Sequence, residues 1–516
     1  MPSRRDVLRI LLLGSGTLYL APGLGSCTQT KQQSVHRASR HSPGVGHQRF
    51  EIAHRYIRDH QTNTLDWQAT RSSSIDVAIV GAGPAGLTAA ALLRTAGYDV
   101  ALIENEPVGG GAARAGTYND VRYPLAAIYF VEREGIVADL CRLAGVTPIP
   151  VPEDSLILDG ASFANLWDDA TITSLPIKPT EKTSLRCFRD DLLRLRQQEQ
   201  VPEYPLPEEL PPHWRRLDAM DAATYIAGYQ SPLLRSLLDM YTRSSMGGML
   251  EQVNAYALLN FYASEIGTQR YTFAGGLAGL AAPLAAMFGS ALHTGLTCIR
   301  ISDDRTGANV WAIDRDGGLH RFHARAVIVA TQKFMLPWII PELPAAQQAA
   351  MRSLQYAPFL TVHLCGKETL LPPGFDVWVP GGDKLFTDII NANATSAPPS
   401  NNGVVASIYA PRTSADRAIL QSEDVLAAFA RTIAERATHV LPTINADAVE
   451  EVHVFGWGHA LVVPTPGSHS GLAQAARRPF GHILFANTDN DSSPAFENAV
   501  SHGARAAESA IALLKQ

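Results

Sequence analysis

The sequence is poor in cysteine and in charge, and both shortages narrow the classes of protein that it can encode. Its five cysteines form no Cys-x-x-Cys pair and have no zinc-like spacing from histidine, so we predict neither a disulfide framework nor a metal site. Charged residues make up 18% of the chain, the net charge is -6, and no basic stripe is visible. Such a chain cannot neutralise many phosphates, which argues against a nucleic-acid partner.

Long apolar runs are absent outside the N-terminus. None approaches the roughly 20 residues that a helix needs to cross a bilayer, so the body of the chain is expected to be soluble. With 516 residues, 46% of them hydrophobic, the chain is long enough for more than one hydrophobic core.

The N-terminal stretch SRRDVLRILLLGSGTLYLAPGLGSC has the order of a secretory signal. Arg4 and Arg5 precede an apolar run and then small residues, and the arginine pair favours the twin-arginine export machinery. Residues 24–27 resemble a bacterial lipoprotein processing site, where Cys27 would be acylated. We therefore predict a signal peptide over residues 1–27 and a location in the periplasm or on the outer face of the membrane. Simple cleavage and membrane attachment through a lipidated Cys27 both stay open.

From Ser74 the pattern becomes that of a nucleotide-binding fold. The runs IDVAIV and DVALIE are typical of buried strands, GAGPAG of a glycine turn, and LTAAALLRTAG of a helix that ends at Gly97. A β-α-β unit of about 30 residues has this order. We predict an α/β fold, in which a Rossmann-like domain is interrupted by insertions that form a mixed α+β substrate domain.

The glycine turn has the spacing of a dinucleotide-binding motif. Gly81, Gly83 and Gly86 complete Gly-x-Gly-x-x-Gly directly after a strand. The first glycine allows the tight turn, the second lets the backbone approach a pyrophosphate, and the third lets the helix pack on the strand. Glu104 ends the second strand, where a carboxylate can accept hydrogen bonds from ribose hydroxyls and repel a 2′-phosphate. The spacing itself leaves FAD and NAD open.

The later segments resemble the flavin amine oxidase superfamily, which includes protoporphyrinogen oxidase-like and phytoene desaturase-like enzymes. ENEPVGGGAARAG resembles its second glycine motif, FAGGLAGLAAPLA its mid-chain glycine segment, and AVIVATQ a later flavin-domain strand. FGWGHALVVPTPG resembles its tryptophan-to-proline-glycine segment, and ILFANTDND with FENAVSHGARAA its final FAD motif. The resemblance runs in motif order over residues 75–516 and implies FAD as the cofactor.

The resemblance also implies domain boundaries and the residues that hold FAD. Residues 28–73 are predicted to form a polar tether and a short helix. The predicted FAD-binding domain consists of residues 74–135, 266–345 and 451–516. The predicted substrate-binding domain consists of residues 136–265 and 346–450. The expected FAD ligands are Gly81, Gly83, Pro84, Ala85, Gly86, Glu104, Gly110, Gly111, Arg114, Cys298, Asp489, Asn498 and Ala499. Among them, Asp489 would be the acid that meets the ribitol chain.

The sequence departs from the family near the reacting end of the flavin. Asn498 stands where a glycine is common, and Thr361 or His363 falls where many members carry a lysine beside flavin N5. Candidates for the substrate cavity are Trp457, His459, Tyr129, Phe130 and His363, and we predict catalytic roles for Trp457, His459 and His363. An aromatic wall would suit an amine that must be neutral when it loses hydride.

Three functions are compatible with these residues. The first is an exported FAD-dependent oxidoreductase that oxidises an amine, either a polyamine or an amino acid, with oxygen or a redox protein as electron acceptor. The second is an FAD-dependent desaturase or dehydrogenase of an apolar, isoprenoid-like substrate. The third is a non-enzymatic, membrane-tethered flavoprotein. The export signal fits any of them, because the twin-arginine route carries folded proteins that already hold their cofactor.

Overall fold

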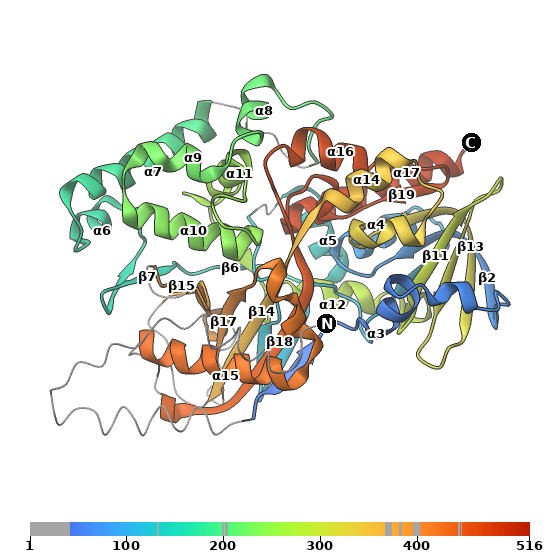
Figure 1. The fold of residues 1–516 in the computed structure, drawn as a ribbon, viewed down its shortest axis with the longest axis horizontal. Coiled ribbons are helices and arrows are strands. Elements are labelled where there is room, and N and C mark those ends of the chain that lie inside the picture. Colours follow the sequence, from blue (N-terminus) through green and yellow to red (C-terminus); the bar gives the residue numbers. More distant parts are fainter. Residues whose placement is uncertain are drawn as a thin grey trace.

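The computed structural model describes residues 42–131, 134–198, 201, 205–366, 374–380, 384–395, 403–441, 444 and 446–516. The predicted signal peptide, Cys27 and part of the predicted tether lie outside these residues. The described residues form two large β-sheets flanked by helices, with a further group of helices, α6 to α11, beside the second sheet (Figure 1). This is the α/β architecture that the sequence predicts.

The first sheet contains the β-α-β unit of the glycine turn. Its strands follow the order β10-β3-β2-β13-β12-β11, with β19 beside β13, and the pairs among β10, β3, β2, β13 and β19 are parallel. The strands are β2 (Arg71–Val80), β3 (Val100–Glu104), β10 (Leu292–Thr294), β11 (Thr297–Asp303), β12 (Ala308–Ile313), β13 (Leu319–Val329) and β19 (Ile483–Phe485). Residues 77–80 are buried because apolar cores lie on both faces of the parallel strands.

Two helices rich in small residues cover one face of this sheet. Helix α4 (Pro84–Thr95) begins directly after the glycine turn and packs against the C-terminal helix α17 (Phe496–Leu514). The helices approach so closely that a Cβ added to Gly503 would lie 2.3 Å from the Ala85 carbonyl oxygen. The start of α4, where Ala85 lies, is therefore fixed against α17.

The second sheet has the order β1-β18-β14-β17-β16-β15-β7-β8. Its strands are β1 (Gly44–His47), β7 (Ser155–Leu158), β8 (Ala161–Ala164), β14 (Gln355–Gly366), β15 (Asp376–Trp378), β16 (Asp388–Asn391), β17 (Val404–Pro411) and β18 (Val449–Val463). Helix α15 (Glu423–Val440) packs on one face (Figure 1). The opposite face is free to line a cavity.

Two strands of this sheet, β1 and β18, lie in segments that the sequence assigns to units other than the substrate-binding domain. Strand β1 falls within residues 28–73, predicted as tether and short helix. Strand β18 falls within 451–516, predicted as part of the FAD-binding domain, except for its first two residues. Both join the second sheet, because β18 pairs with β14 along almost its whole length and offers its other edge to β1. Residues 449–463 therefore belong structurally with the substrate-side sheet.

The remaining elements connect the sheets or form the helical group. They are β4 (Ala115–Tyr118), β5 (Val121–Pro124), β6 (Ile149–Pro150), β9 (Tyr271–Thr272), α3 (Glu51–Ala53), α5 (Gly135–Ala144), α6 (Asp169–Ser174), α7 (Pro179–Gln198), α8 (Pro212–Asp218), α9 (Ala222–Ile226), α10 (Pro232–Met246), α11 (Ala255–Glu265), α12 (Ala278–Ala286), α13 (Leu336–Ile339), α14 (Ala345–Ser353) and α16 (Ala473–Ala476). Helices α7, α10 and α11 share an apolar core of their own. Within the described ranges, no helix combines the length and the apolar character of a membrane span.

The contact between α17 and α4 gives a stability test. Gly503→Ala should lower the free energy of unfolding by about 1–3 kcal/mol, because its Cβ would overlap a backbone oxygen. Gly228→Ala is the matched control, since nothing lies within 4 Å of its added Cβ. Urea denaturation of both variants provides the measurement. Equal stability of the two variants would contradict the packing described here.

Candidate functional site

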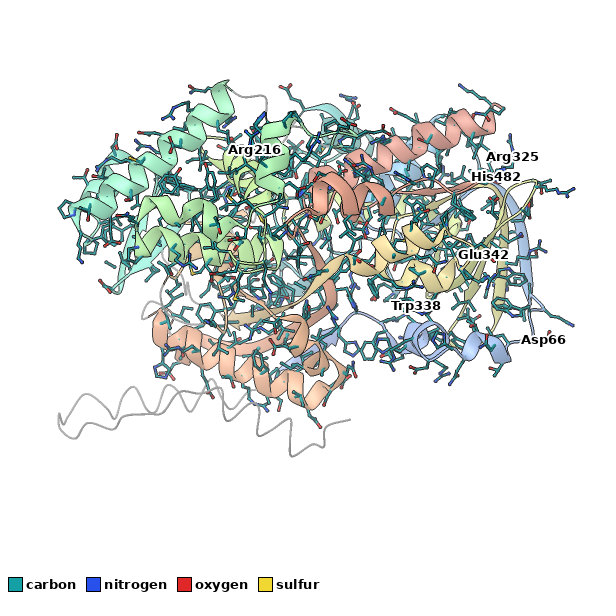
Figure 2. All side chains as sticks on the ribbon, turned by 45° about the horizontal axis from the view of Figure 1, so that its top comes forward. Asp66, Arg216, Arg325, Trp338, Glu342 and His482 are labelled. Carbon is teal, nitrogen blue, oxygen red and sulfur yellow. The ribbon has the colours of Figure 1, made fainter. Side chains whose placement is uncertain are left out.

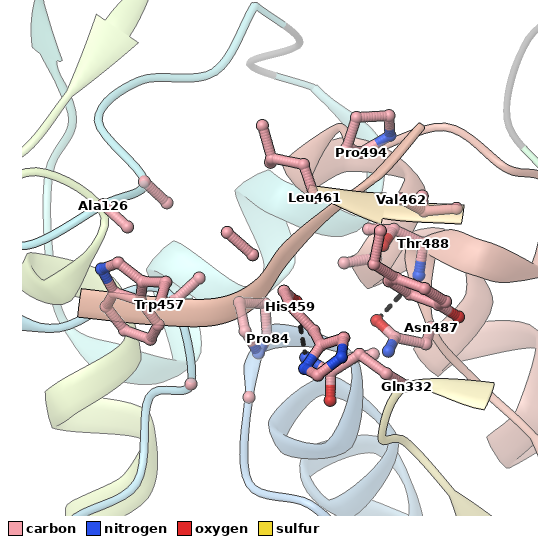
Figure 3. Close-up of a pocket in the computed structure, with 18 of the residues that line it drawn as sticks. Pro84, Ala126, Gln332, Trp457, His459, Leu461, Val462, Asn487, Thr488 and Pro494 are labelled. Atoms are coloured by element: carbon pink, nitrogen blue, oxygen red, sulfur yellow. Dashed lines mark hydrogen bonds between the residues drawn. The ribbon is translucent and has the colours of Figure 1, made fainter. Parts of the chain in front are cut away.

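A cavity of about 1800 Å³ is lined by residues of both sheets and of the helical group. Small-molecule sites in proteins usually measure about 300–1,000 Å³, so this cavity has room for a dinucleotide together with a substrate. It reaches the surface near Trp338 on α13, which lines it and is 43% exposed (Figure 2). Strand β18 crosses the cavity, with Trp457, His459 and Leu461 along it (Figure 3).

One end of the cavity is built from glycine backbone and the start of α4. Gly81 has a φ of +99°, and a Cβ added there would lie 2.8 Å from the Ala330 oxygen. A Cβ on Gly111 would lie 2.9 Å from the Cα of Gly83, so these two backbone segments can approach each other only without side chains. Gly83 is the N-cap of α4 and makes no side-chain cap. The helix N-terminus therefore presents its partial positive charge to the cavity, as pyrophosphate binding requires.

Arg114 has one guanidinium nitrogen that is available to donate a hydrogen bond to a ligand. Its Nε donates to the Gly111 oxygen at 3.0 Å and its Nη1 to Glu106 at 2.9 Å. Its buried Nη2 has no hydrogen-bond partner in the described part of the chain, although the residue lines the cavity. An unsatisfied buried donor costs about 1–3 kcal/mol, and a pyrophosphate oxygen would remove that cost. The residues present thus fit FAD.

Glu104 and Cys298 line the part of the cavity that continues from the glycine turn. The Ala82 N–H donates to one Glu104 oxygen at 2.7 Å and the Glu106 N–H to the other at 2.9 Å. Both oxygens keep acceptor capacity for ribose hydroxyls. Burial raises the pKa of Glu104, and it raises the pKa of the Cys298 thiol to about 12. We call this part of the cavity the adenosine end.

The cavity brings most of the predicted site residues together. Those that line it are Gly81, Gly83, Pro84, Ala85, Glu104, Gly111, Arg114, Cys298, Ala499, Trp457, His459, Tyr129 and Phe130. Gly86, Gly110, Asn498, Asp489 and His363 do not. A Cβ on Gly86 would lie 1.9 Å from the Gly81 oxygen, so this glycine serves packing, as its place in the motif predicts.

Asp489 does not fit its predicted role as the ribitol acid. It is buried, and its carboxylate accepts hydrogen bonds from the Lys333 N–H (2.8 Å), the Lys333 Nζ (2.6 Å) and the Tyr356 hydroxyl (2.6 Å). The chain after β19 enters a tight turn that directs Asp489 away from the cavity and leaves Asn487 and Thr488 to line it (Figure 3). These two residues replace Asp489 as candidates for FAD contact.

Asn498 and Gly110 do not line the cavity, but they hold backbone segments that surround it. Asn498 donates to the carbonyl oxygens of Thr488 and Ser493 at 3.0 and 2.8 Å and so holds the loop that contains Thr488. Gly110 has a φ of +125° and its N–H donates to the Ala82 oxygen at 2.7 Å. Both residues act on the site through the backbone that they fix.

His363 lies outside the cavity and cannot act on a substrate there. Its ring nitrogens contact the hydroxyls of Ser407 at 2.8 Å and Thr361 at 3.2 Å. The side chain is completely buried, and this burial lowers its pKa to about 3. The structure therefore gives His363 no access to the cavity. It shares a face of β14 with Phe359 but lies further along the strand, where the Tyr123 ring covers it at 4.4 Å between ring centres.

Trp457 and His459 do line the cavity, but neither offers a proton near neutral pH. The Trp457 indole donates to the Leu125 oxygen at 2.9 Å, and the Arg114 guanidinium lies 4.9 Å from its ring centre. His459 stacks on Phe334 with ring centres 3.9 Å apart. Burial first, and then the charge of Arg417, lowers the pKa of His459 to about 3. These side chains can orient a ligand, while acid catalysis by His459 is disfavoured.

One face of the second sheet carries a row of cavity-lining side chains. Residues paired across neighbouring strands, and residues two apart on one strand, share a face. By this register the row consists of Trp457, Phe359, Tyr409, Asp388, Trp378 and Asp376. The row is aromatic on β18 and acidic on β16 and β15. Three strand spacings separate β18 from β16, which is about 14 Å.

The acidic end of this row was not predicted from the sequence. Asp376 and Asp388 are 2% and 1% exposed, and one carboxylate oxygen of each has no hydrogen-bond partner in the resolved ranges. Burial, and then the charge of Asp388, raises the pKa of Asp376 well above its usual value. Burial raises the pKa of Asp388 to about 6. An aspartate inside each of the apolar runs FDVWV and TDII was the available signal.

A third buried acid, Glu265, lies at the end of α11 and lines the same cavity. Burial raises its pKa to about 7, although the nearby Arg270 and the Tyr241 hydroxyl, which donates at 2.8 Å, both favour the charged form. The acidic end of the cavity thus contains three carboxyl groups that resist ionisation. A cationic ligand would make ionisation favourable again.

Comparisons with known proteins agree with this site. The chain matches the family described as flavin containing amine oxidoreductase over residues 84–511. A putrescine oxidase bound to putrescine has a TM-score of 0.66 and 20% identity, with 86% of this chain and 100% of that chain covered. Cyclohexylamine oxidase from Brevibacterium oxydans has a TM-score of 0.67 and 19% identity, covering the same shares.

A fatty acid isomerase from P. acnes shares the fold as well, with a TM-score of 0.62, 15% identity, and 83% and 97% of the two chains covered. At these identities the structures show a common fold. No curated protein sequence matches the chain.

Arg114 provides a test of the cofactor site. Arg114→Gln should weaken FAD retention about tenfold or more, because the unpaired donor and the charge are lost. The measurement is the ratio of flavin to protein absorbance after extended dialysis. Arg122→Gln, on the exposed side of β5, is the control and should keep wild-type flavin. Full flavin content in Arg114→Gln would overturn this assignment.

Proposed function

Because the chain belongs to the flavin-containing amine oxidoreductase family, we propose that it oxidises an organic amine that enters the cavity as a cation. The protein is an FAD-dependent oxidoreductase, and FAD supplies the hydride acceptor when it is bound. The observation that supports an amine is the pair of buried, incompletely paired carboxylates of Asp376 and Asp388 in the cavity.

A buried carboxylate without a partner is costly, and an ammonium group is the ligand that best offsets the cost. Asp376 and Asp388 lie on adjacent strands and face the same side, so a single cation can contact both. An apolar substrate would leave these oxygens against hydrocarbon, where each unpaired polar group costs several kcal/mol. The acidic end therefore favours the amine over the isoprenoid-like substrate that the sequence left open.

The row of cavity-lining side chains on the second sheet has an acidic end and an aromatic end, and together they suit a substrate with two amino groups. The carboxylates at β15 and β16 would keep one of them protonated. The aromatic side chains of Trp457 and Phe359, about 14 Å away across three strands, form an apolar wall. Such a wall lowers the pKa of an amine that it desolvates and so supplies the neutral amine that hydride loss requires. A polyamine satisfies both ends, whereas an amino acid would bring its carboxylate toward the acids.

Similar structures support the same class of substrate. The putrescine oxidase is described as bound to putrescine, a diamine, and the cyclohexylamine oxidase is named for an amine. Membership of an oxidoreductase family argues against the third function, that of a non-enzymatic flavoprotein. The electron acceptor is proposed to be oxygen or a redox protein.

We further propose that the enzyme works outside the cytoplasm. The support is the sequence of residues 1–27, with its arginine pair and its cysteine at the end of a small-residue stretch. The segment precedes the family match, which begins at residue 84. Lipidation of Cys27 would hold the enzyme at a membrane face.

The amine class can be tested on the purified, flavin-loaded protein under anaerobic conditions. Diamines and polyamines should bleach the flavin absorbance, while amino acids and polyenes should not. Bleaching by polyenes alone would remove the amine proposal and restore the desaturase.

Asp376→Asn and Asp388→Asn should each raise the KM for a diamine about tenfold or more, with a smaller change in kcat, because the distal ammonium loses its partner. Thermal stability should be unchanged or higher, since a buried carboxyl group that is costly to ionise is removed. Asp316→Asn, in the exposed turn between β12 and β13, is the control. An unchanged KM in both cavity variants would contradict the proposal that these carboxylates bind the distal ammonium group.

Glu265 gives a pH test with a defined sign. Its pKa is about 7 in the folded protein and 4.5 as the ordinary value, so the folded state holds a proton that unfolding releases. The free energy of unfolding should therefore fall as pH rises from about 4.5 to 7. Glu265→Gln should reduce this fall when denaturation curves are compared at several pH values. An identical pH dependence in the variant would contradict the assignment.

The export proposal has its own test. Replacing Arg4 and Arg5 by lysine should leave the protein in the cytoplasm when cell fractions are probed by immunoblot. Unchanged export of the variant would defeat the twin-arginine assignment.

A further inference from the structure

Residues 44–58 cover the adenosine end of the cavity. Eight residues of this segment line the cavity: His47, Gln48, Arg49, Phe50, Ala53, His54, Ile57 and Arg58. The segment lies before residue 84, where the family match begins. Arg58 is exposed on this side and Trp338 on the other, so the opening of the cavity lies between the segment and α13.

The segment is attached to the second sheet through β1. Strand β1 runs parallel to β18, from Gly44 opposite His453 to His47 opposite Gly456. The Gln48 N–H donates to the Gly456 oxygen at 3.0 Å. A Cβ on Gly44 would lie 2.6 Å from the His453 ring, so this close pairing depends on glycine.

A second attachment reaches the residues that follow Glu104. The Arg49 N–H donates to Glu106 at 2.8 Å, and the Asn105 side chain donates to the Arg49 oxygen at 2.9 Å. The other oxygen of Glu106 accepts from Arg114. Glu106 therefore connects the segment directly to the arginine that fits the pyrophosphate.

A third attachment is apolar. Ile57 is 7% exposed and belongs to the core beneath the first sheet, and Ile52, Ala53 and Tyr56 pack against the same core. Phe50 lies between the rings of His47 and His54, 5.2 and 4.8 Å from their centres. The segment is thus fixed on both sheets, and we call residues 44–58 the clasp.

We propose that the clasp holds FAD by its adenosine half and that Arg49 is the residue that binds it. The Arg49 backbone is fixed at its N–H by Glu106 and at its carbonyl by Asn105, the residues that follow Glu104, which is predicted to meet the ribose. Arg49 lines the cavity, and no ion pair between its guanidinium and an acidic side chain is found among the residues described. A terminal nitrogen lies 3.9 Å from the position of a Cβ on Gly295, in the turn before the strand of Cys298. A guanidinium there can stack on the adenine ring or donate to the ribose.

The clasp also controls release of the cofactor. Because it joins the two sheets across the adenosine end, the contacts of Arg49, Gln48 and Ile57 should slow the release of FAD through the opening beside it. Its dissociation should then report the opening of residues 44–58. This inference rests on FAD as the cofactor and is independent of the proposed amine substrate.

The test uses full-length, FAD-loaded protein and follows the recovery of free flavin fluorescence after dilution. Arg49→Ala should release FAD about tenfold faster or more. Arg55→Ala is the matched control, because Arg55 is exposed on the same segment and does not line the cavity. Equal release from the two variants would overturn the proposal.

Two further readouts separate binding from a general loss of structure. ADP contains only the adenosine half, so Arg49→Ala should weaken ADP binding to the flavin-stripped protein by the same factor as FAD binding. Asn105→Ala leaves the clasp residues in place but removes one attachment, and it should speed both FAD release and amide exchange over residues 44–58. Weakened FAD binding with unchanged ADP binding would contradict contact with the adenosine half. Exchange that does not respond to removal of FAD would contradict the clasp.

Discussion

The pairing of β14 with β18 is the interaction on which the site depends. These antiparallel strands match from Gln355 opposite Val463 to Gly366 opposite Val449, and this register decides which side chains face the cavity. It directs Phe359 and Trp457 into the cavity. His363 shares the face of Phe359 but lies further along β14, beside Ser407 and under the Tyr123 ring. A slip of one residue would exchange the two faces and place apolar core residues in the cavity. The free edge of β18 then carries β1, so the same strand serves the substrate wall and the adenosine end.

Local sequence was enough to predict the phosphate end of the site. Gly81, Gly83 and Glu104 have roles that depend on backbone conformation and on the order of one β-α-β unit, and such requirements are visible in contiguous residues. Asp489 shows the limit of this reasoning. A tight turn rotates it toward Lys333, a cation from another loop, and no spacing in the sequence reports that ion pair.

The acidic end could not be predicted because its members come together only through the sheet. Asp376 and Asp388 belong to short, separate strands, and an aspartate within each apolar run does not by itself report the partner strand. Register places them side by side, and burial then raises the pKa of both. Strands β1 and β18 join the second sheet through pairing of the same long-range kind. Long-range strand pairing, rather than local propensity, decides to which sheet a segment belongs.

The parallel pairing of β1 with β18 has a consequence for assembly. Residues 44–47 pair with residues 453–456, about 400 positions later, so this contact closes one of the longest loops in the chain and is expected late in folding. During synthesis the partner strand does not exist until most of the polypeptide has been made. The adenosine end therefore stays accessible until the final stage, and a cofactor that arrives before then is enclosed by the last strand to dock. A strand synthesised early is thus among the last to find its place in the fold.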